Sequence, residues 1–228
     1  MNKTILSTGL TLLLALGAQA TVVNWYSGTL TSVIADNSAA GSTFNTSGGT
    51  WSGSPSGILN NVSVVLNISG GYNGDLYGYL VYNDGNTTQT AILLNRVGGG
   101  SGTAAASTSG FGGGSTSDFA TLQSAGVTLS DTGTSGSIQT VAAAAGNSYT
   151  TGGANLNSTF LNMSSGGTWT LFLADISAGD QSTLMSWGLN VSVVPEPATW
   201  ALLIFCSGFL VMGVARGLRR DVVGTTAH

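Results

Sequence analysis

Hydrophobic and polar positions alternate over several short segments in the middle of the chain, which lies between two longer apolar runs. The clearest alternation lies in residues 61–68, 168–174 and 184–193. A period of two places successive side chains on opposite faces of a sheet, so these segments are predicted to be strands. About eight to ten short strands at roughly ten-residue spacing predict an all-β sandwich. Further strands are predicted at residues 22–26, 29–34, 75–82, 89–97 and 119–129, with a strand or helical turn at 137–145.

The segment 75–82 shows the alternation in detail. Leu76, Leu80 and Tyr82 are predicted to share one face of the strand, and Tyr77 and Tyr79 the other. The sequence Asn-Asp-Gly-Asn that follows is a hairpin turn signal. The segment is therefore expected to pair with the strand at 89–97.

The first apolar run has the three parts of a secretory signal peptide. Lys3 gives a positive start, residues 5–16 are apolar, and Ala18-Gln19-Ala20 is a small-x-small cleavage site. Residues 1–20 are predicted to enter the general secretion machinery and to be removed by signal peptidase. Cleavage after Ala20 leaves residues 21–194 as the folded body.

The second apolar run, residues 198–215, carries no charge. Eighteen helical residues span about 27 Å, which is enough to cross the hydrocarbon core of a bilayer. Proline residues just before the run stop the helix from extending outward, because proline lacks a donor and restricts its predecessor. A basic cluster follows it, and the positive-inside rule keeps that cluster and the tail, residues 221–228, in the cytoplasm.

The order of these parts resembles the PEP-CTERM sorting signal of bacterial surface proteins. The resemblance covers residues 195–220, and the tail 221–228 is longer than is usual for that signal. It implies recognition and cleavage by an exosortase, a transient stay in the inner membrane, and a Gram-negative host that secretes polysaccharide or forms biofilm. The alternative is a plain single-span anchor. The residues that match the signal are Pro195, Glu196, Pro197, Arg216, Arg219 and Arg220.

Charged residues are sparse in the body. Arg96 is its sole cation, and it contains seven aspartates but no Lys, His, Glu or Cys. A nucleic-acid partner is excluded because nothing would neutralise phosphates. Zinc or iron sites of the Cys/His type and internal disulfides are excluded by the same inventory.

Two segments of the body resemble the P domain (P/Homo B) of proprotein convertases. Residues 74–80 and 93–98 are similar to its first half, and residues 167–175, 179–180 and 184–189 to its last strands. The resemblance implies a jelly-roll-like antiparallel β-sandwich, and a module that is not catalytic itself but stabilises a subtilisin-like domain in convertases. The chain has no room for such a protease domain, and the body has no histidine for a Ser-His-Asp triad.

Three aspartates form a candidate calcium site. Asp175 ends a predicted strand, Asp180 follows in a tight loop, and Asp75 lies in the turn before another strand. Calcium prefers several oxygen ligands, which loop carboxylates and carbonyls supply. The alternative is that these side chains cap turns through nearby backbone amides.

Other candidate sites are less specific. Trp51 lies in a Gly/Ser-rich segment and is the best candidate for an exposed platform that stacks on sugar rings. Asp131-Thr132-Gly133 matches the short signature of aspartic proteases, but those enzymes need two such aspartates. No spacing selects a carboxylate pair for glycoside hydrolysis.

The sequence predicts an exported, non-catalytic protein of the cell surface or extracellular matrix, sorted by an exosortase and presenting a P-domain-like sandwich. One alternative is a carbohydrate- or calcium-binding adhesion module, with exopolysaccharide as the implied ligand. A second alternative is an accessory domain of a separately encoded subtilisin-like protease.

Overall fold

The computed structural model describes residues 19–97, 116–141, 143–153, 155–195 and 205–209. The chain divides into two units, one of residues 20–193 and one of residues 1–19 with 194–228. The first unit is the body. Within the second unit the described residues include a short helical turn at 205–209.

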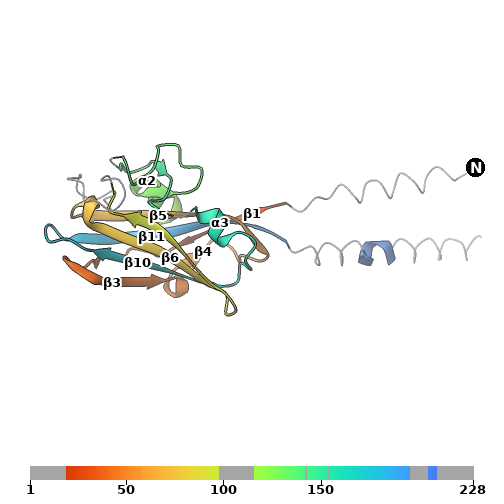
Figure 1. Cartoon of the computed structure of the whole chain (residues 1–228). Helices are drawn as coiled ribbons and strands as arrows, with labels where there is room; N and C mark the ends of the chain where they lie inside the picture. Colours follow the sequence, from red (N-terminus) through yellow and green to blue (C-terminus); the bar gives the residue numbers. More distant parts are fainter. Residues whose placement is uncertain (1–18, 98–115, 142, 154, 196–204, 210–228) are drawn as a thin grey trace, which may run out of the picture. The chain divides into compact units, whose positions relative to one another are not determined.

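The body contains two β-sheets (Figure 1). The larger sheet has the order β4 (Thr50–Trp51), β1 (Thr21–Tyr26), β11 (Ser182–Val194), β5 (Ile58–Gly70), β8 (Val127–Leu129) and β9 (Ser148–Tyr149), with β2 (Ser32–Val33) also paired to β11. The smaller sheet has the order β3 (Ser38–Asn45), β10 (Thr168–Asp175), β6 (Leu76–Asn83) and β7 (Thr88–Asn95). The prediction of an all-β body is confirmed.

The two sheets share one hydrophobic core. A single cluster of buried side chains includes Trp25 and Trp187 from the larger sheet, and Leu80 and Trp169 from the smaller one. In β6 the buried and half-exposed positions alternate as predicted, with Leu76, Leu80 and Tyr82 inside. Burial of such side chains stabilises the fold by roughly 1.5–3 kcal/mol each.

Strand β5 departs from alternation because it is covered on both faces. Residues 62–68 are all buried. Two short helices, α2 (Phe119–Ala125) and α3 (Leu156–Phe160), pack on β5, and Figure 1 shows α2 beside β5. The partial alternation in the sequence reflects this second covering layer.

Several predicted elements need correction. Residues 119–129 were expected to be a strand, but they form helix α2 followed by the short strand β8. The predicted strand 29–34 is reduced to β2, since Thr31 has a φ of 51° that interrupts extended backbone. Residues 137–145 form no named strand or helix among the residues described there.

The sandwich is also not wholly antiparallel. Strands β8 and β9 pair in parallel, with Thr128 opposite Ser148 and Leu129 opposite Tyr149. Parallel neighbours require a crossover connection, which residues 130–147 provide. Strand β1 pairs antiparallel with β11 and β4, β10 with β3 and β6, β11 with β2, β5 with β8, and β6 with β7.

The predicted membrane segments fall mostly outside the described residues. Residues 1–18 of the predicted signal peptide are not described, and of the predicted span 198–215 only residues 205–209 are. Within the described part of the chain, no helix combines the length and apolar character needed to cross a membrane.

Candidate functional site

The most unusual cluster of side chains in the body is an acidic corner formed by Asp36, Asp75 and Asp175 with Ser182 and Arg96. Asp175 is the last residue of β10 and lies opposite Leu76 of β6 and Ser38 of β3. Asp75 ends the short 3-10 helix η2 (Asn73–Asp75). Asp36 lies between β2 and β3. Three strand ends thus meet where these carboxylates lie.

Asp175 is fully buried, with 0% of its surface exposed. Neither of its carboxylate oxygens has a hydrogen-bond partner of standard geometry, and neither does the buried Ser182 hydroxyl beside it. Burial raises the pKa of Asp175, and the charges of Asp36 and Asp75 raise it further, while the hydroxyl and amide of Ser182 lower it. A buried carboxylate in this state is costly.

The lone cation of the body does not neutralise Asp175. The Nη2 atom of Arg96 lies 4.0 Å from Oδ1 of Asp75 and donates to the Ser177 hydroxyl at 2.7 Å. Its Nε donates to the Gly74 carbonyl at 3.3 Å. The Arg96 side chain is therefore held by Asp75 and two neighbouring loops.

Asp36 and Asp180 differ sharply in their surroundings. Oδ2 of Asp36 accepts a hydrogen bond from the Gly179 amide at 3.3 Å, and its Oδ1 is buried without a partner. Asp180 is exposed. The structure thus brings Asp75 and Asp175 together as predicted, leaves Asp180 at the surface, and adds Asp36, which the sequence analysis did not select.

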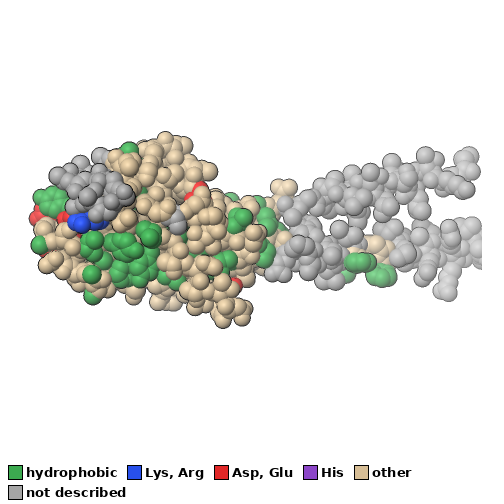
Figure 2. All heavy atoms as spheres, in the orientation of Figure 1, with side chains coloured by type: hydrophobic (Ala, Val, Ile, Leu, Met, Phe, Trp, Pro, Cys, Tyr) green, Lys and Arg blue, Asp and Glu red, His purple; other side chains and the backbone are tan. Residues whose placement is uncertain are grey.

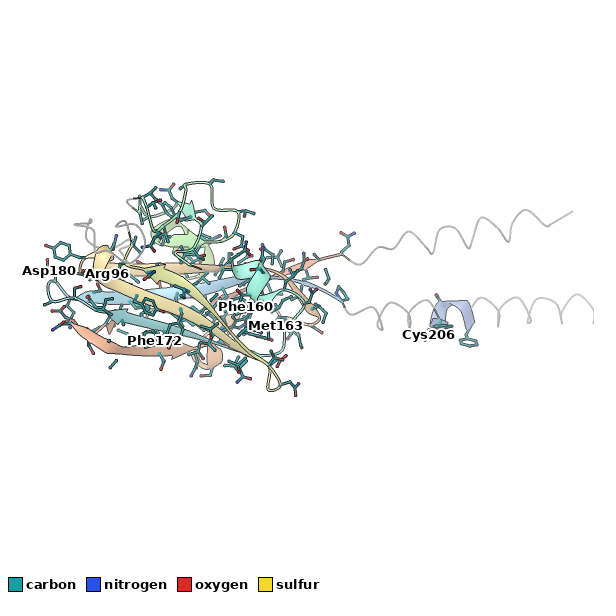
Figure 3. All side chains as sticks on the ribbon, viewed as in Figure 1. Arg96, Phe160, Met163, Phe172, Asp180 and Cys206 are labelled. Carbon is teal, nitrogen blue, oxygen red and sulfur yellow. The ribbon has the colours of Figure 1, made fainter. Side chains whose placement is uncertain are left out.

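The corner is not a tight metal cluster. Within the described ranges, no three His, Cys, Asp or Glu side chains are arranged closely enough to hold a metal ion. Figure 2 shows acidic side chains beside a Lys or Arg side chain at one end of the body. Figure 3 places Arg96 and Asp180 at that end and Met163 toward the other.

Three other aspartates are fully engaged by backbone amides. Both oxygens of Asp131 accept hydrogen bonds, from the amides of Leu156 and Asn157 at 2.7 Å each. Asp118 forms a capping box with Thr121 at the start of α2. Asp84 accepts from Asn86 and Thr87 in the hairpin turn. The match of Asp131 to the protease signature therefore has a structural explanation.

Trp51, the candidate sugar platform, lies in a strand and is only partly exposed. Trp51 lies in strand β4 opposite Trp25 of β1 and packs, half-buried, against the core. The nearby surface groove is lined by Thr50 and Ser52, but not by Trp51. The side chain contributes to packing because β4 closes this edge of the larger sheet.

The remaining predicted site residues lie at the ends of the body. Ala20 precedes β1 directly, and Ala18 lies outside the described residues. Pro195 follows β11 directly. The other sorting-signal residues also lie outside the described part, namely Glu196, Pro197, Arg216, Arg219 and Arg220.

Comparisons with known proteins identify no family for this chain and only weakly similar solved structures. No protein-family model matches the chain, and no curated protein does either. The crystal structure of the serine protease of Aeromonas sobria in complex with its chaperone has a TM-score of 0.43 and 16% identity, covering 82% of this chain and 30% of that chain. A crystal structure of the serine protease of Aeromonas sobria has a TM-score of 0.39, with the same identity and coverage. The chain spans less than a third of the solved chains it matches, and a likeness this weak supports no conclusion.

Proposed function

We propose that the chain is an exported, non-catalytic surface protein that an exosortase sorts and cleaves through its C-terminal segment. The signal is the succession of Pro195-Glu196-Pro197, the apolar run 198–215 and the arginines that follow. Its destination is the cell surface or the extracellular matrix of a Gram-negative bacterium. The body is the part that is delivered, a sandwich of the jelly-roll kind similar to the P domain.

The observation that carries this proposal is the agreement between the compact body and the two processing positions. The compact unit runs from Ala20 to Val193. Strand β1 begins one residue after the proposed signal-peptide cleavage, and β11 ends one residue before Pro195. Removal of both flanking segments would therefore leave every named strand intact.

The ends of the body are also neighbours. Thr21 of β1 lies directly opposite Val193 of β11 in the larger sheet. The first and last residues of the body therefore lie side by side in the larger sheet. Cleavage by a membrane enzyme would need no change in the strands of the body, because the proposed processing site follows the last strand directly.

The absence of catalytic groups from the body sequence agrees with a non-catalytic role. The only histidine is His228, and the only lysine is Lys3. A general base would have to be an aspartate, and three of the seven aspartates already cap backbone amides. The chain is therefore proposed to be a substrate of a processing enzyme.

The experiment that tests the proposal is an intact-mass measurement on the protein recovered from its host's envelope and culture medium. We expect a mass that lacks residues 1–20 and also the apolar run. A mass that retains both the apolar run and His228 would contradict sorting and favour a plain anchor.

A variant sharpens this test. Replacement of Pro195, Glu196 and Pro197 by alanine is expected to leave an unprocessed form in the membrane fraction. The matched control is Pro55→Ala, which changes the remaining proline of the chain within the body. Normal processing of the triple variant would show that the proline-flanked glutamate is not the signal.

A further inference from the structure

We propose that the acidic corner is a calcium-binding site in which Asp36 and Asp175 are the charged ligands. This inference is independent of sorting, since it concerns only the body. The sequence-based hypothesis named Asp75, Asp175 and Asp180. The proposal keeps Asp175, adds Asp36, and leaves out the exposed Asp180 and also Asp75, which lies against Arg96. The argument rests on the buried carboxylates, their charge balance and the chemistry of the surrounding atoms.

The first step is the lack of partners. Three carboxylate oxygens, two of Asp175 and one of Asp36, are buried and have no hydrogen-bond partner of standard geometry. The hydroxyl and amide of Ser182 are close enough to Asp175 to lower its pKa, but they do not satisfy the two oxygens. The Ser182 hydroxyl, which is also 0% exposed, has no partner of standard geometry either. Native proteins rarely leave such groups unsatisfied, so each requires an explanation such as an ion.

The second step is the balance of charge. Asp36 and Asp75 both act electrostatically on Asp175. Within the described residues the single cation near them is Arg96, whose guanidinium lies against Asp75 and Ser177. Asp175 and Asp36 remain without a positive partner, and a buried charge of this kind is stable only when it is paired or bound to a metal.

The third step is the type of ion. The buried atoms without standard partners at the corner are carboxylate and hydroxyl oxygens, and the body contains no Cys or His. Oxygen-only sites select hard cations, and calcium accepts irregular sets of carboxylates, carbonyls, hydroxyls and water. Because three acidic groups do not converge here, neutral oxygens and water must complete the shell.

The fourth step is the rigidity of the frame. A side chain at Gly71 would lie 1.9 Å from the Ser182 hydroxyl, so the chain after β5 passes directly over that residue. Gly71 has a φ of 66°, which favours glycine. Asp175 is fixed at the end of β10 by pairing to both β3 and β6. Two of the oxygen-bearing residues are thus held in place before any ion binds.

The acidic corner lies at the start of strand β11. Strand β11 begins at Ser182 beside the acidic corner and ends at Val194, and thirteen residues of strand span roughly 40 Å. The site therefore lies at the other end of β11 from Val193, the residue that pairs with Thr21. With few charged ligands its dissociation constant is expected in the range of extracellular modules, about 10⁻⁴–10⁻³ M.

The test is a thermal melt of the full-length protein in mild detergent, followed by tryptophan fluorescence, with CaCl₂ or with EGTA. At a calcium concentration about a hundredfold above the dissociation constant, the midpoint is expected to rise by about 5–10 °C. Equilibrium dialysis should find one bound calcium per chain. An unchanged midpoint together with no bound calcium would overturn the proposal.

Two variants and a control assign the ligands. Asp175→Asn and Asp36→Asn are each expected to remove the calcium-dependent rise, and the second serves if the first does not fold. Asp180→Asn changes an exposed aspartate of the neighbouring loop and should retain the rise. Loss of the rise in Asp180→Asn with retention in Asp36→Asn would overturn the assignment in favour of the ligand set expected from sequence.

Discussion

Asp131 and Asp175 are two carboxylates of a body that contains a single cation, and they differ in their hydrogen-bond partners. Both oxygens of Asp131 accept amide hydrogen bonds at 2.7 Å from the first turn of α3. Asp175 is more deeply buried, yet its oxygens accept none of standard geometry. Backbone amides satisfy the carboxylate of Asp131. The carboxylate of Asp175 has no such bonds of standard geometry, so a proton or a cation would stabilise it.

The difference separates aspartates that backbone amides satisfy from the aspartate at the proposed calcium site. Hydrogen bonds from backbone amides stabilise a carboxylate without any ion, and a carboxylate near a helix start is also favoured by the helix dipole. A buried carboxylate without such bonds destabilises the fold until a proton or a cation binds. Sequence alone does not distinguish the two, because both are aspartates that follow a strand.

The largest expected effect in this comparison is at Asp131. Asp131→Ala removes both hydrogen bonds that join the crossover to α3, and loss of two charge-assisted bonds is expected to lower the free energy of unfolding by about 2–3 kcal/mol. The midpoint of a thermal melt should fall by about 5–10 °C. The fall should be the same in calcium and in EGTA, and a calcium-dependent fall would mean that the two regions are coupled.

The next effect has the opposite sign. In EGTA, Asp175→Asn removes a buried charge while keeping the size of the side chain, and it should raise the free energy of unfolding by about 1–2 kcal/mol. In calcium the same variant should be less stable than the unmodified protein. A variant that is destabilised to the same extent in both media would contradict the comparison.

The pH dependence provides a further separation. The pKa of Asp175 is raised above its ordinary value of 3.8, mainly by burial and then by the charges of Asp36 and Asp75. Between 3.8 and the raised value the folded chain holds a proton that the unfolded chain has lost, so stability falls as pH rises through this window. Melts in EGTA from pH 4 to 7 should therefore show a decline that Asp175→Asn lacks.

Much of the fold could be predicted from the sequence. Strand β6, most of β10 and the first residues of β11 alternate because one face packs on the shared core. Strand β3 was missed because its Ser, Ala and Gly residues carry no apolar period. It lies at the edge of its sheet and is held by backbone pairing to β10.

The missed strand explains the incomplete candidate site. Asp36 lies two residues before β3. It comes close to Asp175 because Ser38, the first residue of β3, pairs with Asp175 at the end of β10. A contact between residues this far apart in sequence is set by topology, which no local pattern encodes. The pair Asp75 and Asp175 could be predicted because each ends or begins a strongly patterned strand.

The helix α2 was missed for a different reason. Residues 119–129 contain enough β-branched and apolar residues to suggest a strand, but Asp118 and Thr121 form a reciprocal capping box that starts a helix. The signal was present in the sequence three residues apart. A capping pair at the start of a short segment outweighs a weak period of two.

The smallest expected effect is at Asp84, where water can replace a lost hydrogen-bond acceptor. Asp84 is half-exposed at the hairpin between β6 and β7 and accepts amide hydrogen bonds from Asn86 and Thr87. These bonds lower its pKa, so the stability they contribute is present above pH 3.8 and is lost as pH falls through the lowered value. Asp84→Ala should lower the melting midpoint less than Asp131→Ala at pH 7, because water replaces the lost acceptor, and the difference from the unmodified protein should diminish at low pH. If Asp84→Ala lowered the midpoint as much as Asp131→Ala does, the number of amide hydrogen bonds, and not burial, would determine the loss of stability. The lack of such bonds at Asp175 would then be its most destabilising feature.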